Sequence, residues 1–275
     1  MALIDDCTHY YKFDESSGDL IDAEGSLDGS VNGCTYGETG IINDSYDFES
    51  ANSDYISFGS DAFTASVGYS FWFNTDDLGA AGDGTMIYYK GSDNTAVRES
   101  IAIVGDEIEY YFSVGTPGSN NQYITTDANL STGTWYHVVV TGSGDGGEGN
   151  YQIWIDGSEK SVSWHYVGDD RSRPTGSDIS YMGRDRHPYF TYFNGYLDEF
   201  GIFDDEISDA DIDSLYNGGD GWAYPFDPLP TGTNITLNIN DSFKEVANAY
   251  VNVDDAWKEV ANAYVNVDDS WKEVF

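Results

Sequence analysis

Positive charge is scarce in this sequence. The 275 residues carry 11 Lys and Arg against 49 Asp and Glu, which gives a formal net charge of −38. Phosphate groups need a basic face, so we expect no nucleic-acid partner and no anionic membrane partner. Such a chain repels itself in dilute salt, but at molar salt the Debye length of ~3 Å screens the repulsion. The composition indicates a protein that works in brine; a calcium-rich protein and an ordinary acidic marine protein are the alternatives.

Long apolar runs and cysteines are also lacking. No run of apolar residues is long enough for a membrane-spanning helix, so we expect no membrane insertion. The N-terminus MALIDDCTHYYKF has no basic segment followed by an apolar one, so we expect synthesis in the cytoplasm without a signal peptide. The two cysteines, Cys7 and Cys34, are too few for a disulfide framework. We interpret them as buried thiols. A disulfide between them is the alternative, because both lie near the first strands.

Helical periodicity is nearly absent between residues 9 and 203. Short segments that alternate apolar and polar residues are separated there by Gly, Asp, Asn or Ser, for example GYSFWFN, EIEYYFSV and NYQIWID. The succession predicts an all-β fold, a two-sheet antiparallel sandwich. The exception is ISDADIDSLYNGG, where Ser208 as N-cap, Ile212 and Leu215 on one face, and Gly218 at the end predict a short helix.

Proline gathers in one stretch, DGWAYPFDPLPTGT, which holds three of the six Pro residues. Proline at this density predicts a stiff, extended connector. We therefore expect a sandwich domain over residues 1–219, a linker over 220–234 and a separate C-terminal segment over 235–275.

The C-terminal segment repeats itself with a period of 14 residues. SFKEVANAYVNVDD is followed by AWKEVANAYVNVDD and then by SWKEVF. Each unit predicts a hairpin in which YVNV and WKEV pair across an Asp-Asp turn. Hairpins this thin are marginal alone, so we expect them to form an oligomer, a trimer or pentamer, or to dock on a larger assembly. The residues expected at that contact are Phe243, Val253, Trp257, Val267 and Trp271.

Several motifs occur in the order found in one known family. They are YDFES…DYISF (46–58), GYSFWFN (68–74), WYHVVV (135–140), YQIWIDG (151–157), NGYLDEFGIF (194–203) and ISDADIDSLY (207–216). Together they resemble the LamG-like jelly rolls of the concanavalin A-like lectin/glucanase superfamily, over roughly residues 8–218. The resemblance implies a jelly roll that binds glycans or proteins. It also implies calcium near the rim, with Asp22 and Asp198 as the first ligands to test; Asp198 has a structural hydrogen-bonding role as its alternative.

The glucanases of the superfamily place Glu-x-Asp-x-Glu on one strand, and this sequence lacks that pattern. DEIEYY (106–111) puts Glu107 and Glu109 on one strand face without a third carboxylate. With 49 acidic residues such pairs arise by chance, so we expect no enzymatic activity.

The scarce arginines suggest where a ligand would bind. Four of the five lie within residues 171–186, interleaved with aromatic residues. Aromatic faces stack on sugar rings and Arg forks bind carboxylates or hydroxyls, so a rim site for a glycan, including an acidic one, is predicted. The alternative is that these arginines neutralise nearby Asp and join the rim to a neighbouring subunit. The predicted ligand-binding residues are Trp164, Tyr166, Arg171, Arg173, Arg184, Arg186, Tyr189 and Tyr192.

These features together suggest a setting. Tandem repeats of this kind resemble those that end some structural proteins of tailed viruses. We therefore predict a virion surface protein, a spike, turret or tail fibre of a virus of a halophilic archaeon, that binds host glycan or S-layer and contacts other virion proteins. A purely structural decoration protein, a cellular lectin and a glycoside hydrolase are the alternatives.

Overall fold

The structure is a computed structural model. It describes residues 3–79, 84–91, 97–114, 120–168, 171–185 and 191–226, and in the C-terminal segment the strands over 234–239, 242–247, 250–253, 256–259, 264–267 and 270–273. The chain divides into two compact units, Met1–Tyr224 and Pro225–Phe275, which are described separately. The domain boundaries at residues 219 and 234 stay predictions.

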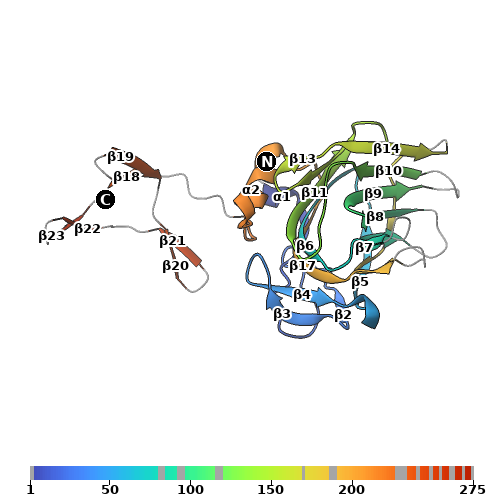
Figure 1. Ribbon diagram of the computed structural model, residues 1–275, viewed down its shortest axis with the longest axis horizontal. Coiled ribbons are helices and arrows are strands. Elements are labelled where there is room, and N and C mark those ends of the chain that lie inside the picture. The colour runs from blue at the N-terminus through green and yellow to red at the C-terminus, as the bar shows by residue number, and fades with distance from the viewer. Residues whose placement is uncertain are drawn as a thin grey trace. The chain divides into compact units, whose positions relative to one another are not determined.

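The first unit is an antiparallel sandwich of two sheets, as the sequence predicts (Figure 1). One sheet has eight strands in the order β13-β12-β11-β6-β17-β4-β3, with β1 also paired to β17. Their bounds are β1 Cys7–Tyr11, β3 Thr35–Thr39, β4 Asp44–Phe48, β6 Ser66–Thr75, β11 Trp135–Ser143, β12 Tyr151–Ile155, β13 Ser158–Glu159 and β17 Gly195–Phe203.

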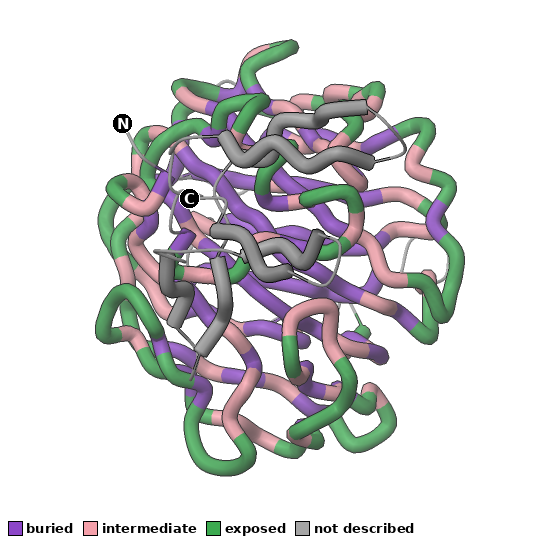
Figure 2. Tube along the Cα trace, turned by 90° about the vertical axis from the view of Figure 1, so that its left-hand side faces the viewer, coloured by how far each residue is buried: buried purple, intermediate pink, exposed green. Residues whose placement is uncertain are grey.

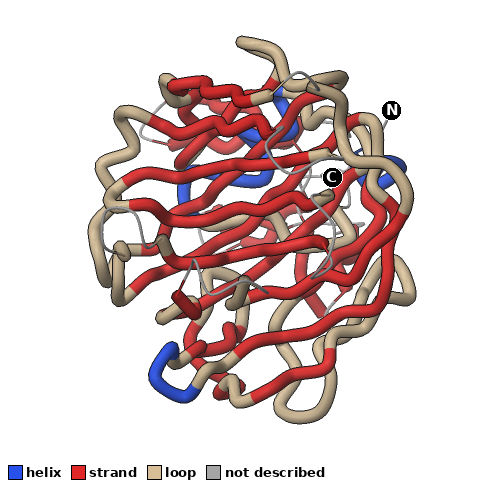
Figure 3. Tube along the Cα trace, turned by 90° about the vertical axis from the view of Figure 1, so that its right-hand side faces the viewer, coloured by secondary structure: helices blue, strands red, loops and turns tan. Residues whose placement is uncertain are grey.

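The other sheet has nine strands in the order β14-β10-β9-β8-β7-β15-β5-β2, seen face-on in Figure 3. Strand β16 adds to β7 in parallel, while every other described pairing of this sheet is antiparallel. The bounds are β2 Ser30–Asn32, β5 Tyr55–Ala62, β7 Thr85–Gly91, β8 Arg98–Val104, β9 Glu107–Ser113, β10 Asn120–Thr125, β14 Val162–Val167, β15 Ser177–Met182 and β16 Thr191–Tyr192.

Alternation along each strand builds the core between the sheets (Figure 2). In β8, Ile101 and Ile103 are fully buried in the core cluster, and in β9 so are Ile108, Tyr110 and Phe112. Their neighbours in sequence point to the opposite face of the nine-stranded sheet. The core is rich in aromatic rings, such as Phe71 stacked on Phe200 with centroids 5.1 Å apart.

Helices are short, which agrees with the sequence. The helix α2 spans Asp209–Tyr216; the Ser208 side chain accepts from the backbone N–H of Asp211, and Ile212 and Leu215 are buried. The predicted N-cap and apolar face are therefore confirmed. The remaining helical turns are α1 Leu3–Asp6, η1 Ser50–Asn52 and η2 Asn217–Gly219. In the described part of the chain, no helix has the length and apolar character needed to cross a membrane.

Cys7 and Cys34 are both buried free thiols, as interpreted from their number. Burial raises the pKa of each thiol well above its usual value. The alternative of a disulfide between them is therefore wrong.

The second unit contains the predicted hairpins. Strand β18 (Asn234–Ile239) pairs with β19 (Ser242–Ala247), β20 (Tyr250–Val253) with β21 (Ala256–Glu259), and β22 (Tyr264–Val267) with β23 (Ser270–Glu273). Asn252 lies opposite Trp257 and Asn266 lies opposite Trp271, so these two copies of the repeat have the same strand register. Among the described strands each pair is a separate two-stranded sheet rather than part of one meander.

Candidate functional site: a pocket in the nine-stranded sheet

Of the four clustered arginines the structure describes Arg171, Arg173 and Arg184, and these three do not form one site. Arg173 is only 6% exposed, and its Nη2 lies 3.0 and 3.1 Å from the two carboxylate oxygens of Glu99. Its Nε donates to the Thr64 carbonyl at 3.0 Å and its Nη1 donates to the Tyr110 hydroxyl. The prediction that Arg173 faces a ligand on the rim is corrected, because the buried Glu99 and Tyr110 hold its guanidinium inside the protein.

Arg171 is exposed and lies against strand β14. Its guanidinium carbon is 5.1 Å from the Trp164 ring centroid and 4.3 Å from that of Tyr166. The two rings are stacked within 3° of parallel. Trp164 pairs with Tyr123 of β10, a core residue, so this cluster lies at the edge of the inner face of the sheet. The structure brings these three predicted residues together, and their role in ligand binding stays a prediction.

Arg184 lies on the other side of the sheet, after β15. Its guanidinium is surrounded by three Tyr rings, with centroids at 4.8 Å (Tyr55), 5.1 Å (Tyr181) and 5.8 Å (Tyr192). The predicted residues Arg184 and Tyr192 therefore lie together, but apart from the β14 cluster of Trp164, Tyr166 and Arg171. Arg186 and Tyr189 lie outside the described residues.

Asp22 does not fit a calcium ion. Its two carboxylate oxygens accept the backbone N–H groups of Tyr10, Glu24, Gly25 and Leu27 and contact His9 Nδ1 at 2.6 Å. These five donors occupy the lone pairs that a metal would need. Although burial opposes the change, these hydrogen bonds lower the Asp22 pKa to about 2, so the carboxylate stays charged in its loop.

Asp198 is fully buried but has fewer hydrogen bonds to its carboxylate oxygens than Asp22. Its Oδ2 accepts the backbone N–H groups of Ile41 and Ile42 at 2.7 and 3.0 Å, whereas its buried Oδ1 has no hydrogen-bond partner among the described residues. Burial raises its pKa to about 7. Within the described residues, no group of three or more His, Cys, Asp and Glu side chains is arranged to hold a metal. Calcium at Asp198 stays a prediction.

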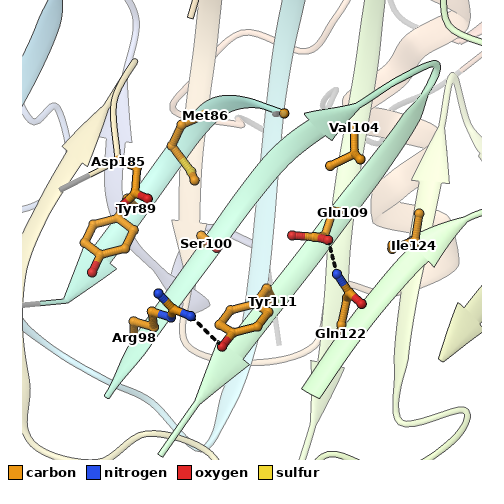
Figure 4. A pocket seen from close by; sticks show the side chains of 11 residues that line it. Met86, Tyr89, Arg98, Ser100, Val104, Glu109, Tyr111, Gln122, Ile124 and Asp185 are labelled. Atoms are coloured by element: carbon orange, nitrogen blue, oxygen red, sulfur yellow. Dashed lines mark hydrogen bonds between the residues drawn. The ribbon is translucent and has the colours of Figure 1, made fainter. Parts of the chain in front are cut away.

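A pocket of about 270 Å³ opens on the face of the nine-stranded sheet that points away from the core (Figure 4). Strands β7, β8, β9 and β10 supply most of its lining. The residues are Gly84, Met86, Tyr89, Arg98, Ser100, Val104, Glu109, Tyr111, Gln122, Ile124 and Asp185. They share this face because each alternates with a core residue, as Ser100 does with Ile101 and Tyr111 with Tyr110.

Strand register places the polar residues of the pocket side by side. Gln122, Tyr111, Ser100 and Tyr89 stand opposite one another across β10, β9, β8 and β7. Tyr181 of β15 comes next to Tyr89, so the Arg184 cluster adjoins the pocket.

The polar groups of the pocket hold one another in place. Arg98 Nη2 donates to the Tyr111 hydroxyl at 2.8 Å, and its guanidinium carbon is 4.7 Å from the centre of that ring. Gln122 Nε2 donates to Glu109 Oε2. Burial raises the Glu109 pKa, and the Gln122 hydrogen bond and the Arg98 charge oppose the rise. Apolar walls with a few fixed donors and acceptors are typical of small-molecule sites.

Sequence analysis missed this pocket, although its signal is present. Glu109 and Tyr111 belong to the predicted strand EIEYYFSV, where Glu109 was noted only as half of a chance carboxylate pair. The other half, Glu107, is outside the pocket lining and accepts from the Ala128 N–H at 3.0 Å and from the Thr125 hydroxyl. The signal was a set of polar and aromatic residues that alternate with the core residues along three successive strands.

Comparison with known proteins agrees with this architecture. The laminin G 3 profile of the concanavalin A-like lectin/glucanase superfamily matches residues 50–213. The chain therefore belongs to that superfamily. Its strands before residue 50 are part of the same sandwich, since β1 and β4 both pair with β17. No curated protein sequence matches the chain.

Solved structures show the same fold at low identity. One is domain 4 of AbnA, an extracellular arabinanase of Geobacillus stearothermophilus, in complex with arabinotriose: 17% identity, TM-score 0.56, covering 75% of this chain and 96% of that one. Another is the botulinum neurotoxin serotype D binding domain: 15% identity, TM-score 0.60, covering 99% and 75%. A third is botulinum neurotoxin type C, whose cell entry depends on two ganglioside molecules: 15% identity, TM-score 0.58, covering 86% and 56%.

Proposed function

We propose that this protein is a glycan-binding module and that the pocket between β7 and β10 is its binding site. The observation that carries the proposal is the pocket itself, with apolar walls beside a fixed Arg, Gln and carboxyl group. The C–H face of a sugar ring packs against apolar side chains, and its hydroxyls bond to such polar groups. The glycan ligands of two proteins with the same fold, arabinotriose and gangliosides, support this choice of ligand class.

We propose binding without catalysis. Glycoside hydrolysis uses two carboxyl groups placed on either side of the scissile bond. The sequence lacks the Glu-x-Asp-x-Glu strand of the glucanases, and Glu107 is held outside the pocket by the Ala128 N–H and the Thr125 hydroxyl. The two carboxyl groups of the pocket, Glu109 and Asp185, therefore do not come from one strand as in those enzymes.

The pocket and the β14 cluster predicted from sequence can be told apart with two matched variants. Arg98 and Arg171 are both stacked on aromatic rings, but only Arg98 lines the pocket. We expect Arg98→Ala to weaken binding of a glycan identified on an array about 10-fold or more, because a charged hydrogen bond contributes ~1.5–3 kcal/mol. Arg171→Ala should change the affinity less than about twofold. The measurement is titration calorimetry on folded variants at high salt.

The reverse pattern, with loss in Arg171→Ala alone, would move the site to Trp164 and Tyr166 as the sequence predicted. If neither variant weakened glycan binding, both proposed binding sites would be wrong. Tyr196→Ala, which alters a half-buried Tyr on the eight-stranded sheet, controls for general effects of truncating a large side chain outside both candidate sites.

The wider setting that we propose rests on the sequence. The acidic composition supports a halophilic origin, and the repeated hairpins support display in several copies on a virion, where linked weak sites gain avidity. The same features support a decoration protein without a ligand as the alternative; a blank glycan array at high salt would favour it.

The tail hypothesis predicts a change of oligomeric state. We expect the full chain to be an oligomer at high salt and a chain that ends at Tyr224, the end of the first compact unit, to be a monomer. Light scattering measures both masses. A monomeric full chain with folded hairpins would contradict the hypothesis, and Trp257→Ala with Trp271→Ala tests the expected contact residues in the full-length protein.

A further inference from the structure

The charges in the pocket differ from those of the arginine-rich rim, where the sequence predicted a site that could accept acidic sugars. Among its described lining residues one cation, Arg98, faces two carboxyl groups, Glu109 and Asp185. One Arg98 N–H group donates to the Tyr111 hydroxyl, and the charge of Asp185 acts on the guanidinium as well. A ligand carboxylate would therefore enter a recess whose described lining holds one basic and two acidic side chains.

Glu109 is placed to recognise a hydroxyl. The residue is 5% exposed, so water competes little with its contacts. One carboxylate oxygen accepts from Gln122, and the other points across the pocket toward Ser100 (Figure 4). A sugar hydroxyl that enters between Glu109 and Ser100 meets a carboxylate that Gln122 already holds in place. It can donate a hydrogen bond to this carboxylate without a rearrangement of the side chain.

We propose that the pocket takes an uncharged sugar and rejects one that carries a carboxylate, with Glu109 and Asp185 setting the preference. This inference rests on the proposed glycan-binding function and names the ligand class of the same site. Like charges brought together out of water repel strongly, and carboxylate oxygens satisfy sugar hydroxyls. The acidic glycan considered from the sequence depended on an arginine cluster that the structure divides.

The net charge of −38 would also repel acidic ligands, and salt separates the two effects. At ~1 M salt the Debye length is ~3 Å, so repulsion by the molecule as a whole is screened while contact inside the pocket is not. Discrimination that persists at this salt concentration therefore comes from the pocket.

The test uses matched oligosaccharides of equal length, galactan with galacturonan and glucan with glucuronan, which differ in a hydroxymethyl group against a carboxylate. With the full-length protein at ~1 M salt, we expect the neutral member of a binding pair to be held at least ~10-fold more tightly. Glu109→Gln should weaken the neutral ligand and narrow the ratio to about threefold or less, because the like charge is gone. Glu159→Gln removes an equal charge from exposed β13 and should leave the ratio unchanged.

Equal or tighter binding of the acidic member by the wild-type protein would overturn the inference and leave the proposed glycan-binding function standing. An unchanged ratio in both Glu109→Gln and Asp185→Asn, with the variants shown to be folded by thermal unfolding, would overturn the assignment of the preference to these two residues. Binding of no member of either pair, together with a blank array, would overturn the function and the inference together.

Discussion

Replacing Arg173 by Ala is expected to lower the free energy of unfolding by ~3–5 kcal/mol. The substitution leaves the Glu99 carboxylate, 1% exposed, without the guanidinium that lies 3.0 Å away. Among the described residues Glu99 then keeps the Tyr110 hydroxyl, which donates to it at 2.5 Å. A buried charge without its partner is far more costly than a lost surface contact. Denaturant unfolding at constant high salt measures the change.

Arg171→Ala is the matched control for this prediction. It removes an arginine two positions away that is exposed and stacked on Trp164 and Tyr166, so the expected loss is below ~1 kcal/mol. The double variant Arg173→Met with Glu99→Gln should recover much of the stability, because no charge is then buried. A loss of less than ~1 kcal/mol in Arg173→Ala would show that the Glu99 contact is not a stabilising element of the interior.

The second large effect depends on pH and comes from His9. Its Nδ1 lies 2.6 Å from Asp22 and its Nε2 lies 3.5 Å from Asp61, which also binds Lys90 at 2.7 Å. Although burial alone lowers the His9 pKa, the hydrogen bonds with the two carboxylates raise it to about 9. A raised pKa in the folded state means that protonation favours folding.

This stabilisation is fully present below the unfolded pKa of ~6.5 and is lost as the pH rises through about 9, and its full size is about 3 kcal/mol. We therefore expect the stability advantage of the wild type over His9→Gln to shrink by that amount between pH 6 and 10. Taking the difference between the two proteins cancels the titration of the remaining acidic groups. A difference that stays constant with pH would contradict the charged His9 contact.

His137 supplies a counterpart of opposite sign. It is 1% exposed, its Nε2 lies 2.9 Å from the Ser70 hydroxyl, and burial lowers its pKa to about 3. The folded protein therefore loses stability as the pH falls below ~6.5. The advantage of the wild type over His137→Gln should shrink toward acid, whereas the advantage over His9→Gln shrinks toward base.

Much of the fold could be predicted from local patterns. NYQIWID marks the half-buried strand β12, GYSFWFN and EIEYYFSV mark the more fully buried β6 and β9, and the Ser208 cap with Ile212 and Leu215 marks α2. These signals work because a half-buried strand or a capped helix imposes its periodicity on residues that are neighbours in the chain. The repeat likewise predicts the hairpins β20–β21 and β22–β23, since both partners lie within one 14-residue unit.

The candidate site could be predicted only in part. The sequence placed weight on arginines because they are few and close together in the chain. The structure places Arg171, Arg173 and Arg184 in three different surroundings. Arg171 stacks on the edge strand β14, Arg173 pairs with Glu99 in the interior, and Arg184 follows strand β15 among Tyr rings. The arginine that lines the pocket, Arg98, stands alone in the sequence.

The sequence by itself determined the sandwich, its superfamily, the closing helix and the paired hairpins, because each depends on periodicity or on motifs that local order preserves. Only the tertiary structure decided which polar residues of a strand face the core and which face outward. In β8, Glu99 points inward and Arg98 outward because Arg173, 74 positions further along, supplies the buried partner that a carboxylate requires. That choice leaves Arg98 in the pocket with Tyr111 and Glu109, and no spacing along the chain records it.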